Sequence, residues 1–257
     1  MPDVMTCASQ LTDRLSNRLI WKMAPKTRTV DTDVPLVTFT FDDVPDTALT
    51  HGATILEQHG ARGTFYIAGS LGGQVERDRT LISPEGCREL ARRGHEIGCH
   101  TFAHRRIRTF GRSLADDLDH SRHYLSECGV EQTPRNFAFP YNAAWPLARR
   151  ILKRRYLTCR GAGEAINRGN VDPWMLKSVE IRQPEEHSLS LTRWIDNVRQ
   201  NPGWLIFFTH DIAEKPTPYG CTPATFERLV GHAAAQGCRI VTVAEATRQL
   251  GWEETSP

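Results

Sequence analysis

Short runs of near-continuous apolar residues recur along the whole chain, and they constrain the fold more than any other feature. Eight such runs lie at 35–41, 63–69, 95–100, 136–141, 155–160, 178–182, 204–210 and 239–243. Strands buried on both faces of a parallel sheet show such runs, whereas strands with one solvated face alternate apolar and polar residues. The runs therefore predict a parallel sheet that is covered on both sides.

Segments of helical character separate these runs. They span 47–59, 84–93, 113–128, 145–154, 188–200 and 222–236. Two of them open with Ser83-Pro84 and Thr222-Pro223, and a hydroxyl cap followed by proline satisfies or removes the first unpaired amides of a helix. The regular alternation of strand and helix predicts an α/β fold of the (β/α) barrel kind, with an open doubly wound sheet as the alternative.

A chain of 257 residues with this alternation is expected to form one main domain. We assign residues 34–257 to it and treat residues 1–33 as an N-terminal extension. Within the extension, residues 11–23 place Leu11, Leu15, Leu19 and Trp21 on or near one side of a helix. Such a helix is expected to pack on the barrel.

Composition excludes several classes of partner and favours the cytoplasm. The chain has 32 basic and 30 acidic residues, a balance that predicts no nucleic-acid partner. The sequence contains no stretch of about 18 apolar residues, so no membrane span is predicted, and the first residues lack the apolar core of a secretory signal. The seven cysteines form no CxxC pair and are expected to be reduced thiols.

Ionisable or geometrically unusual residues follow four of the predicted strands. They are Asp42 and Asp43 after the first run, His100 and His104 after the third, Pro140 and Tyr141 at the end of the fourth, and His210 at the end of the seventh. In parallel β/α folds the carboxyl ends of the strands meet at one rim, where functional groups gather. These side chains are therefore expected to form one site.

His100 and His104 are four residues apart, so on a helical turn both imidazoles would face the same ion. By itself this spacing is more often a solvated or hydrogen-bonded pair. Together with an aspartate from another strand end it matches the two-histidine, one-carboxylate arrangement of catalytic divalent metals. The combination predicts a site for one divalent ion.

The adjacent carboxylates Asp42 and Asp43 need separate accounts. A helix cap or a salt bridge would explain a single aspartate after a strand, but burying two without a cation is costly. One carboxylate can bind the ion, while the other accepts a proton from a water that the ion acidifies. His210 could donate a proton to a leaving amine. The alternative interpretation is that His210 is a neutral histidine in the core, hydrogen-bonded to a backbone carbonyl.

The order TFDD, HTFAH, FPY and THD, from about residue 34 to residue 245, resembles the NodB-homology or polysaccharide deacetylase family, also called carbohydrate esterase family 4. The resemblance implies a distorted (β/α) barrel of seven or eight strands. It implies one divalent metal ion, usually Zn²⁺ with Co²⁺, Ni²⁺ or Mn²⁺ possible, held by Asp43, His100 and His104. It also implies removal of an N-acyl group from an amino sugar.

The same resemblance implies roles for the remaining motif residues. Asp42 would be the general base, His210 the general acid, and Pro140 with the backbone amide of Tyr141 the oxyanion and substrate pocket. The looser match Asp172-Pro173-Trp174 would supply an aspartate that orients His210 and a tryptophan that walls the acyl pocket.

Three positions depart from the family pattern. Ala138 stands where an arginine usually holds the base aspartate, and Asn142 and Val44 stand where glycines are usual. Arg135 or Arg160 could replace the missing arginine.

These observations predict a hydrolase of a linear amide C–N bond acting on a small-molecule or oligosaccharide substrate. One alternative is an amidase or deformylase acting on a non-glycan small molecule. The other is a catalytically silent carbohydrate-binding barrel, which the loss of the arginine favours and the complete set of metal, base and acid residues opposes.

Overall fold

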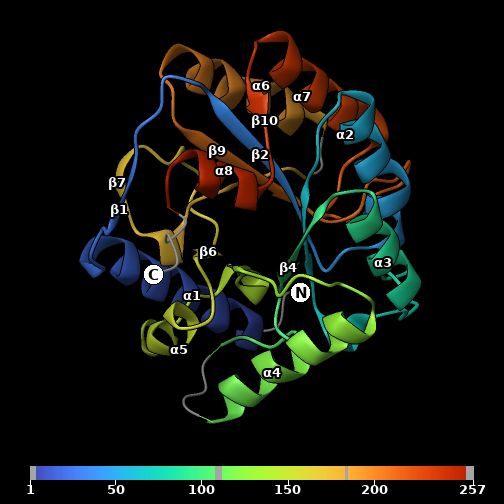
Figure 1. The fold of residues 1–257 in the computed structure, drawn as a ribbon, viewed down its shortest axis with the longest axis vertical. Helices are drawn as coiled ribbons and strands as arrows, with labels where there is room; N and C mark the ends of the chain where they lie inside the picture. The colour runs from blue at the N-terminus through green and yellow to red at the C-terminus, as the bar shows by residue number, and fades with distance from the viewer. Residues whose placement is uncertain (1–3, 108–111, 183–184, 253–257) are drawn as a thin grey trace.

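The computed structural model describes residues 4–107, 112–182 and 185–252, without the side chains of residues 4–11, 112 and 185–189. Its centre is a parallel sheet curled into a half-barrel and surrounded by helices (Figure 1). The strands follow one another across the sheet in the order β6 (Thr158–Arg160), β5 (Asn136–Ala138), β4 (Glu96–Cys99), β3 (Thr64–Ile67), β2 (Leu36–Asp42), β9 (Trp204–Thr209) and β8 (Val179–Glu180), and β10 (Arg239–Ile240) pairs with the start of β2. Each of the eight predicted runs contains one of these strands, so the distorted (β/α) barrel is confirmed.

The helices lie around the outside of this sheet (Figure 1). They are α1 (Val4–Met23), α2 (Thr54–Gln58), which continues a π-helical turn at Ala48–Ala53, α3 (Pro84–Arg92), α4 (Arg112–Glu127), α5 (Arg149–Lys153), α6 (Glu185–Gln200), α7 (Pro223–Ala235) and α8 (Val243–Gln249). Short 3₁₀ turns occupy Gly69–Leu71, Pro140–Asn142, Pro146–Ala148 and Pro173–Met175. The two predicted caps are present, since Ser83 accepts a hydrogen bond from the amide of Gly86 and Thr222 from that of Thr225.

The alternation of side chains along β2 explains how the sheet is covered on both faces. All seven residues of β2 are buried. Phe39 and Phe41 point outward into the core beneath the helices, where Phe41 stacks on Phe65 at 4.5 Å. Thr40 and Asp42, offset by one residue from these rings, belong to the opposite, inner face. The register of β2 thus delivers Asp42 to the inside of the barrel at its carboxyl end.

Two features were not predicted from the sequence. Helix α8 begins at the end of the run 239–243, where no helix was expected, and the strands β1 (Arg28–Val30) and β7 (Gly169–Val171) form a separate antiparallel pair. The pair consists of two three-residue strands with mainly solvated side chains, so it lacks the apolar run that identifies a strand.

Helix α1 contains the helix predicted at residues 11–23. Ile20 enters a buried cluster with Leu152 and Tyr156, and α1 lies beside α5 in the view of Figure 1. No helix among the described residues is long and apolar enough to cross a membrane. The six cysteines whose side chains are described are free and buried.

Candidate metal centre and active site

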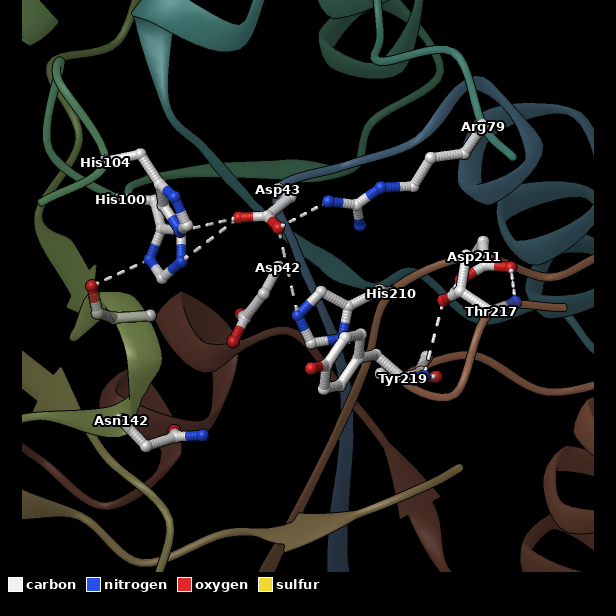
Figure 2. Close-up of polar contacts among 12 residues, drawn as sticks. Asp42, Asp43, Arg79, His100, His104, Asn142, His210, Asp211, Thr217 and Tyr219 are labelled. Carbon is white, nitrogen blue, oxygen red and sulfur yellow. Dashed lines mark hydrogen bonds and ion pairs between the residues drawn. The ribbon is translucent and has the colours of Figure 1, made fainter. Parts of the chain in front are cut away.

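The two aspartates are separated by a sharp turn at the end of β2. The amide of Val44 donates to the carbonyl of Asp42 at 2.5 Å, and Asp43, between them, has φ 57°. Val44 also has φ 57°, in the position where the family glycine would be unstrained. A β-branched residue in this region costs of order 1–3 kcal/mol and persists only where its surroundings enforce it. The turn points the two carboxylates in different directions (Figure 2).

The segment after β4 brings two imidazoles together without a helix. Residues 100–107 form an irregular loop, so the expected helical turn is wrong, but the rings of His100 and His104 still lie 5.2 Å apart. Thr101 and His104 have positive φ values, and the Thr101 hydroxyl accepts from the His104 amide at 3.0 Å. The loop is fixed from α4, because Asp117 accepts hydrogen bonds from two of its backbone amides.

Asp43, His100 and His104 come close enough to share one ion. Each offers a ligand atom, and these atoms all lie within 4.8 Å of one another. Nε2 of His104 is 2.9 Å and Nε2 of His100 3.6 Å from Oδ1 of Asp43. Figure 2 shows both imidazoles facing this oxygen.

The hydrogen bonding of the cluster fits a divalent cation. Oδ1 of Asp43 is buried and has no aligned hydrogen-bond donor, although His104 is near. The Nδ1 atom of His100 lies 2.9 Å from the carbonyl of Ala138, so it carries the proton and leaves the Nε2 lone pair facing Oδ1. An orphaned carboxylate oxygen opposite an imidazole lone pair is the donor set that a metal satisfies.

Electrostatics keep the carboxylate ionised and the buried imidazole neutral. Burial raises the pKa of Asp43, but the close approach of His104 and the nearby imidazoles of His210 and His100 outweigh it and hold the pKa well below its usual range. Burial also lowers the pKa of His100 to about 4. Both groups are thus in the protonation state that binds a metal.

Arg79 is a site residue that the sequence did not reveal. Its Nη2 donates to Oδ2 of Asp43 at 3.2 Å, from the side opposite to His100 and His104 (Figure 2). The residue belongs to a turn in which Val75 pairs with Thr80 and Leu81 with Pro45. Arg79 holds Oδ2, so Oδ1 is the oxygen that faces the imidazoles.

Arg160, from β6, makes an ion pair with Oδ1 of Asp42. The guanidinium is fully buried over the ring of Phe208, and its Nη1 donates to Oδ1 of Asn142 at 3.0 Å. Of the two arginines that could replace the one missing at position 138, Arg160 is the one whose contact with Asp42 the structure shows. Two departures from the family pattern are thus linked, since Asn142 is the second partner of the replacement arginine.

His210 lies at the carboxyl end of β9 on the other side of Asp43. Its Nδ1 is 3.2 Å from the carbonyl of Tyr219, which requires a proton on Nδ1, and its Nε2 is 4.0 Å from Oδ2 of Asp43. Asp211 accepts from the amide and hydroxyl of Thr217 and so closes the loop that carries Tyr219. The loop therefore fixes the orientation of the His210 ring.

Tyr141 and Asn142 follow the buried Pro140 with φ values of 57° and 51°. The Tyr141 ring is half exposed and lies 4.8 Å from that of His104. Pro140 and Tyr141 thus reach the same rim as the metal-ligand candidates.

The structure does not bring Asp172 to His210. Both carboxylate oxygens of Asp172 bind the guanidinium of Arg149. The predicted orienting role is therefore corrected, because the carboxylate is neutralised by an arginine and the carbonyl of Tyr219 holds the imidazole instead. Trp174 donates its indole N–H to the carbonyl of Tyr156 at 2.9 Å and packs at the edge of the core cluster that includes Tyr156, so no contact with the rim supports its role as a pocket wall.

Comparisons with known proteins agree with this fold and identify the family. Residues 29–158, which are 130 of the 257, match the family model described as polysaccharide deacetylase. The chitin deacetylase of Colletotrichum lindemuthianum is 28% identical over 220 residues, covering 82% of this chain and 78% of that protein. A Mycobacterium smegmatis protein classed with the polysaccharide deacetylases superposes with a TM-score of 0.67 at 14% identity, covering 90% of this chain and 96% of that one. A peptidoglycan deacetylase from Bacillus subtilis gives 0.55 at 18% identity, covering 86% and 94%. The family model spans half of the chain, and the chain therefore belongs to the polysaccharide deacetylase family.

Proposed function

We propose that the protein is a metal-dependent hydrolase that removes an N-acyl group, in the first instance N-acetyl, from an amino sugar or a glycan. Family membership and the similarity to a chitin deacetylase support the reaction class. The observation that carries the proposal is the orphaned Oδ1 of Asp43 between two imidazoles, with Asp42 beside it.

In this proposal Asp43, His100 and His104 hold one divalent ion, with Zn²⁺ favoured by the nitrogen-rich donor set. When bound, the ion acidifies a water molecule and polarises the acyl carbonyl. Asp42 accepts the proton from the attacking water. Arg160 engages Oδ1 of Asp42, and we assign Oδ2 to the proton transfer.

Tyr141 and His210 serve the second half of the reaction. The backbone amide of Tyr141 donates to the oxygen on which negative charge develops. The Tyr219 carbonyl holds the Nδ1 proton of His210, so in the doubly protonated ring the second proton is on Nε2, and it is this proton that passes to the departing amine. Nε2 lies 4.0 Å from Oδ2 of Asp43, so the proposed acid is next to a proposed metal ligand.

The test combines metal content with turnover on tag-free protein. We expect about one divalent ion per chain by plasma mass spectrometry, lost in His100→Ala, and deacetylation of chitooligosaccharides that Asp42→Asn lowers about 10²-fold to 10⁴-fold. Activity on small acylamides or formamides alone would redirect the proposal to the non-glycan alternative. A chain that binds no metal after incubation with zinc, or that turns over none of these substrates, would support the silent barrel instead. The cytoplasmic location stays a prediction.

A further inference from the structure

Asn17 of α1 holds the loop that carries the proposed oxyanion donor. Its Nδ2 donates to the carbonyl of Asn142 at 2.7 Å, and its Oδ1 accepts from the amide of Ala144 at 3.0 Å. The side chain of Asn17 is buried and pairs with the loop through both ends of its amide. One turn of α1 thus fixes the backbone on the carboxyl side of Tyr141.

The loop needs such a restraint because its backbone is unusual. Tyr141 and Asn142 are consecutive non-glycine residues with positive φ, and such conformations persist only where the surroundings enforce them. The turn closes itself through two short-range bonds, from Asn142 to Phe139 and from Ala143 to Pro140. In addition to these two bonds, Asn17 forms hydrogen bonds with the carbonyl of Asn142 and with the amide of Ala144, neither of which takes part in the bonds within the turn.

The restraint continues into the barrel through the side chain of Asn142. Its Oδ1 accepts from Arg160, and the same guanidinium holds Asp42. A glycine at position 142, as in the family pattern, would end this path at the backbone. The path therefore exists in this chain because asparagine replaces glycine and Arg160 replaces the arginine missing at position 138.

We propose that Asn17 is a positioning residue for the deacetylation reaction, and that α1 is part of the catalytic unit. Asn17 positions the Tyr141 amide through the backbone of the next residue, Asn142. Through the side chain of Asn142 it also positions Arg160, which holds Asp42. This inference rests on the proposed function. It assigns a role to a residue that lies outside the segment matched by the family model.

A matched control is present on the same helix. Trp21 also donates one hydrogen bond from α1 to the barrel, from its indole N–H to the carbonyl of Met175 at 3.1 Å, at a point away from the Tyr141 loop. Trp21→Phe removes this bond and keeps an aromatic ring. Comparing Asn17→Ala with Trp21→Phe separates positioning of the loop from general docking of α1.

The experiment measures kcat, KM and amide hydrogen exchange on the zinc-loaded full chain. In Asn17→Ala we expect kcat to fall about 10-fold to 100-fold, KM to change less than about threefold, and exchange in residues 139–145 to accelerate, because small displacements of catalytic groups reduce rate more than binding. Trp21→Phe should keep kcat within about threefold and leave that exchange unchanged. Asn17→Ser, whose shorter hydroxyl retains one polar contact, should be intermediate and replaces Asn17→Ala if that variant does not fold.

Equal kcat and equal exchange in the Asn17 and Trp21 variants would overturn the inference. If the wild-type protein turns over no substrate, the proposed function fails by itself, and the exchange data still decide whether Asn17 restrains the loop. Unchanged exchange in Asn17→Ala would overturn the restraint even then.

Discussion

Two clusters of a carboxylate, an imidazole and an arginine lie at opposite ends of the same strand. His95 directly precedes β4 and contacts Glu57, while His100 directly follows β4 and faces Asp43. Burial lowers the pKa of each of the two histidines to about 4. Both carboxyl groups also have lowered pKa values, so the direction of the shifts does not distinguish the clusters.

Hydrogen bonding does distinguish them. Nδ1 of His95 accepts from the amide of Gly63 at 3.1 Å, and its Nε2 donates to Oε1 of Glu57 at 3.0 Å. Arg93 takes both oxygens of Glu57. No buried side-chain polar atom of this cluster lacks a hydrogen-bond partner, whereas Oδ1 of Asp43 does. A perturbed pKa indicates burial and neighbouring charge, and an unsatisfied acceptor beside a free lone pair indicates a place for a ligand.

The most direct way to break this comparison is to exchange each histidine for glutamine. His100→Gln should lose the bound metal and lower activity by more than about 100-fold, because even partners outside the ligand set are worth about 10-fold to 100-fold. His95→Gln should keep the metal and stay within a few-fold of wild-type activity at pH 7. Metal content and kcat/KM of the two purified variants check this. Equal loss of metal would show that the two clusters are not functionally distinct.

The arginine in each cluster gives the next largest expected difference. Arg79→Gln releases Oδ2 of Asp43, so the carboxylate can rotate and we expect metal affinity to fall about 10-fold to 100-fold. Arg93→Gln removes the ion pair with Glu57, a partly exposed partner that keeps its hydrogen bond from His95, and should cost about 1 kcal/mol of stability at most, with unchanged metal affinity. Competition with a chelator measures both affinities. Tighter metal binding in Arg79→Gln would contradict the orienting role, since removal of a positive charge alone favours a cation.

The sequence predicted the sheet well because its strands are buried on both faces. All of β2 and β9 is buried, and such strands appear as continuous apolar runs. Helix α8 was missed because its first residue, Val243, was assigned to the strand run 239–243, although its capping box, Thr242 with Glu245, was a readable signal.

The site was predictable where its residues sit at strand ends. The rule that parallel strands deliver their carboxyl ends to one rim was enough to group Asp43 with His100 and His210. Arg79 was not predictable, because it follows Asp43 by 36 residues in a turn with no motif, and its contact depends on the tertiary path of the chain. The pairing of Asp172 with Arg149 was equally invisible, since sequence does not rank the partners that compete for a carboxylate.

The smallest effect expected from the comparison concerns pH and the satisfied cluster. The pKa of His95 is about 4 in the folded chain and 6.5 in its ordinary state, mainly because burial disfavours the charged ring. Protonation would also break the hydrogen bond from the Gly63 amide, which needs the Nδ1 lone pair. Between these pH values the unfolded chain binds a proton that the folded chain does not, so the free energy of unfolding falls as pH is lowered.

From pH 7 to pH 5.5 the shifted pKa of His95 lowers the free energy of unfolding by about 1 kcal/mol. Glu57 contributes little in this range, because its pKa of about 2 in the folded chain and its ordinary pKa of 4.5 are both below pH 5.5. Urea unfolding of the metal-free wild-type protein should therefore show a lower free energy of unfolding at pH 5.5 than at pH 7. In His95→Gln the same decrease should be smaller by about 1 kcal/mol. His100 also has a pKa lowered to about 4, and its contribution cancels in the difference because both proteins retain it. Parallel losses in the two proteins would mean that His95 binds a proton equally well in the folded and the unfolded chain. The Nδ1 lone pair of His95 would then be available to a proton, although the structure gives it a hydrogen-bond donor. The distinction between the satisfied His95 cluster and the unsatisfied Asp43 cluster would fail.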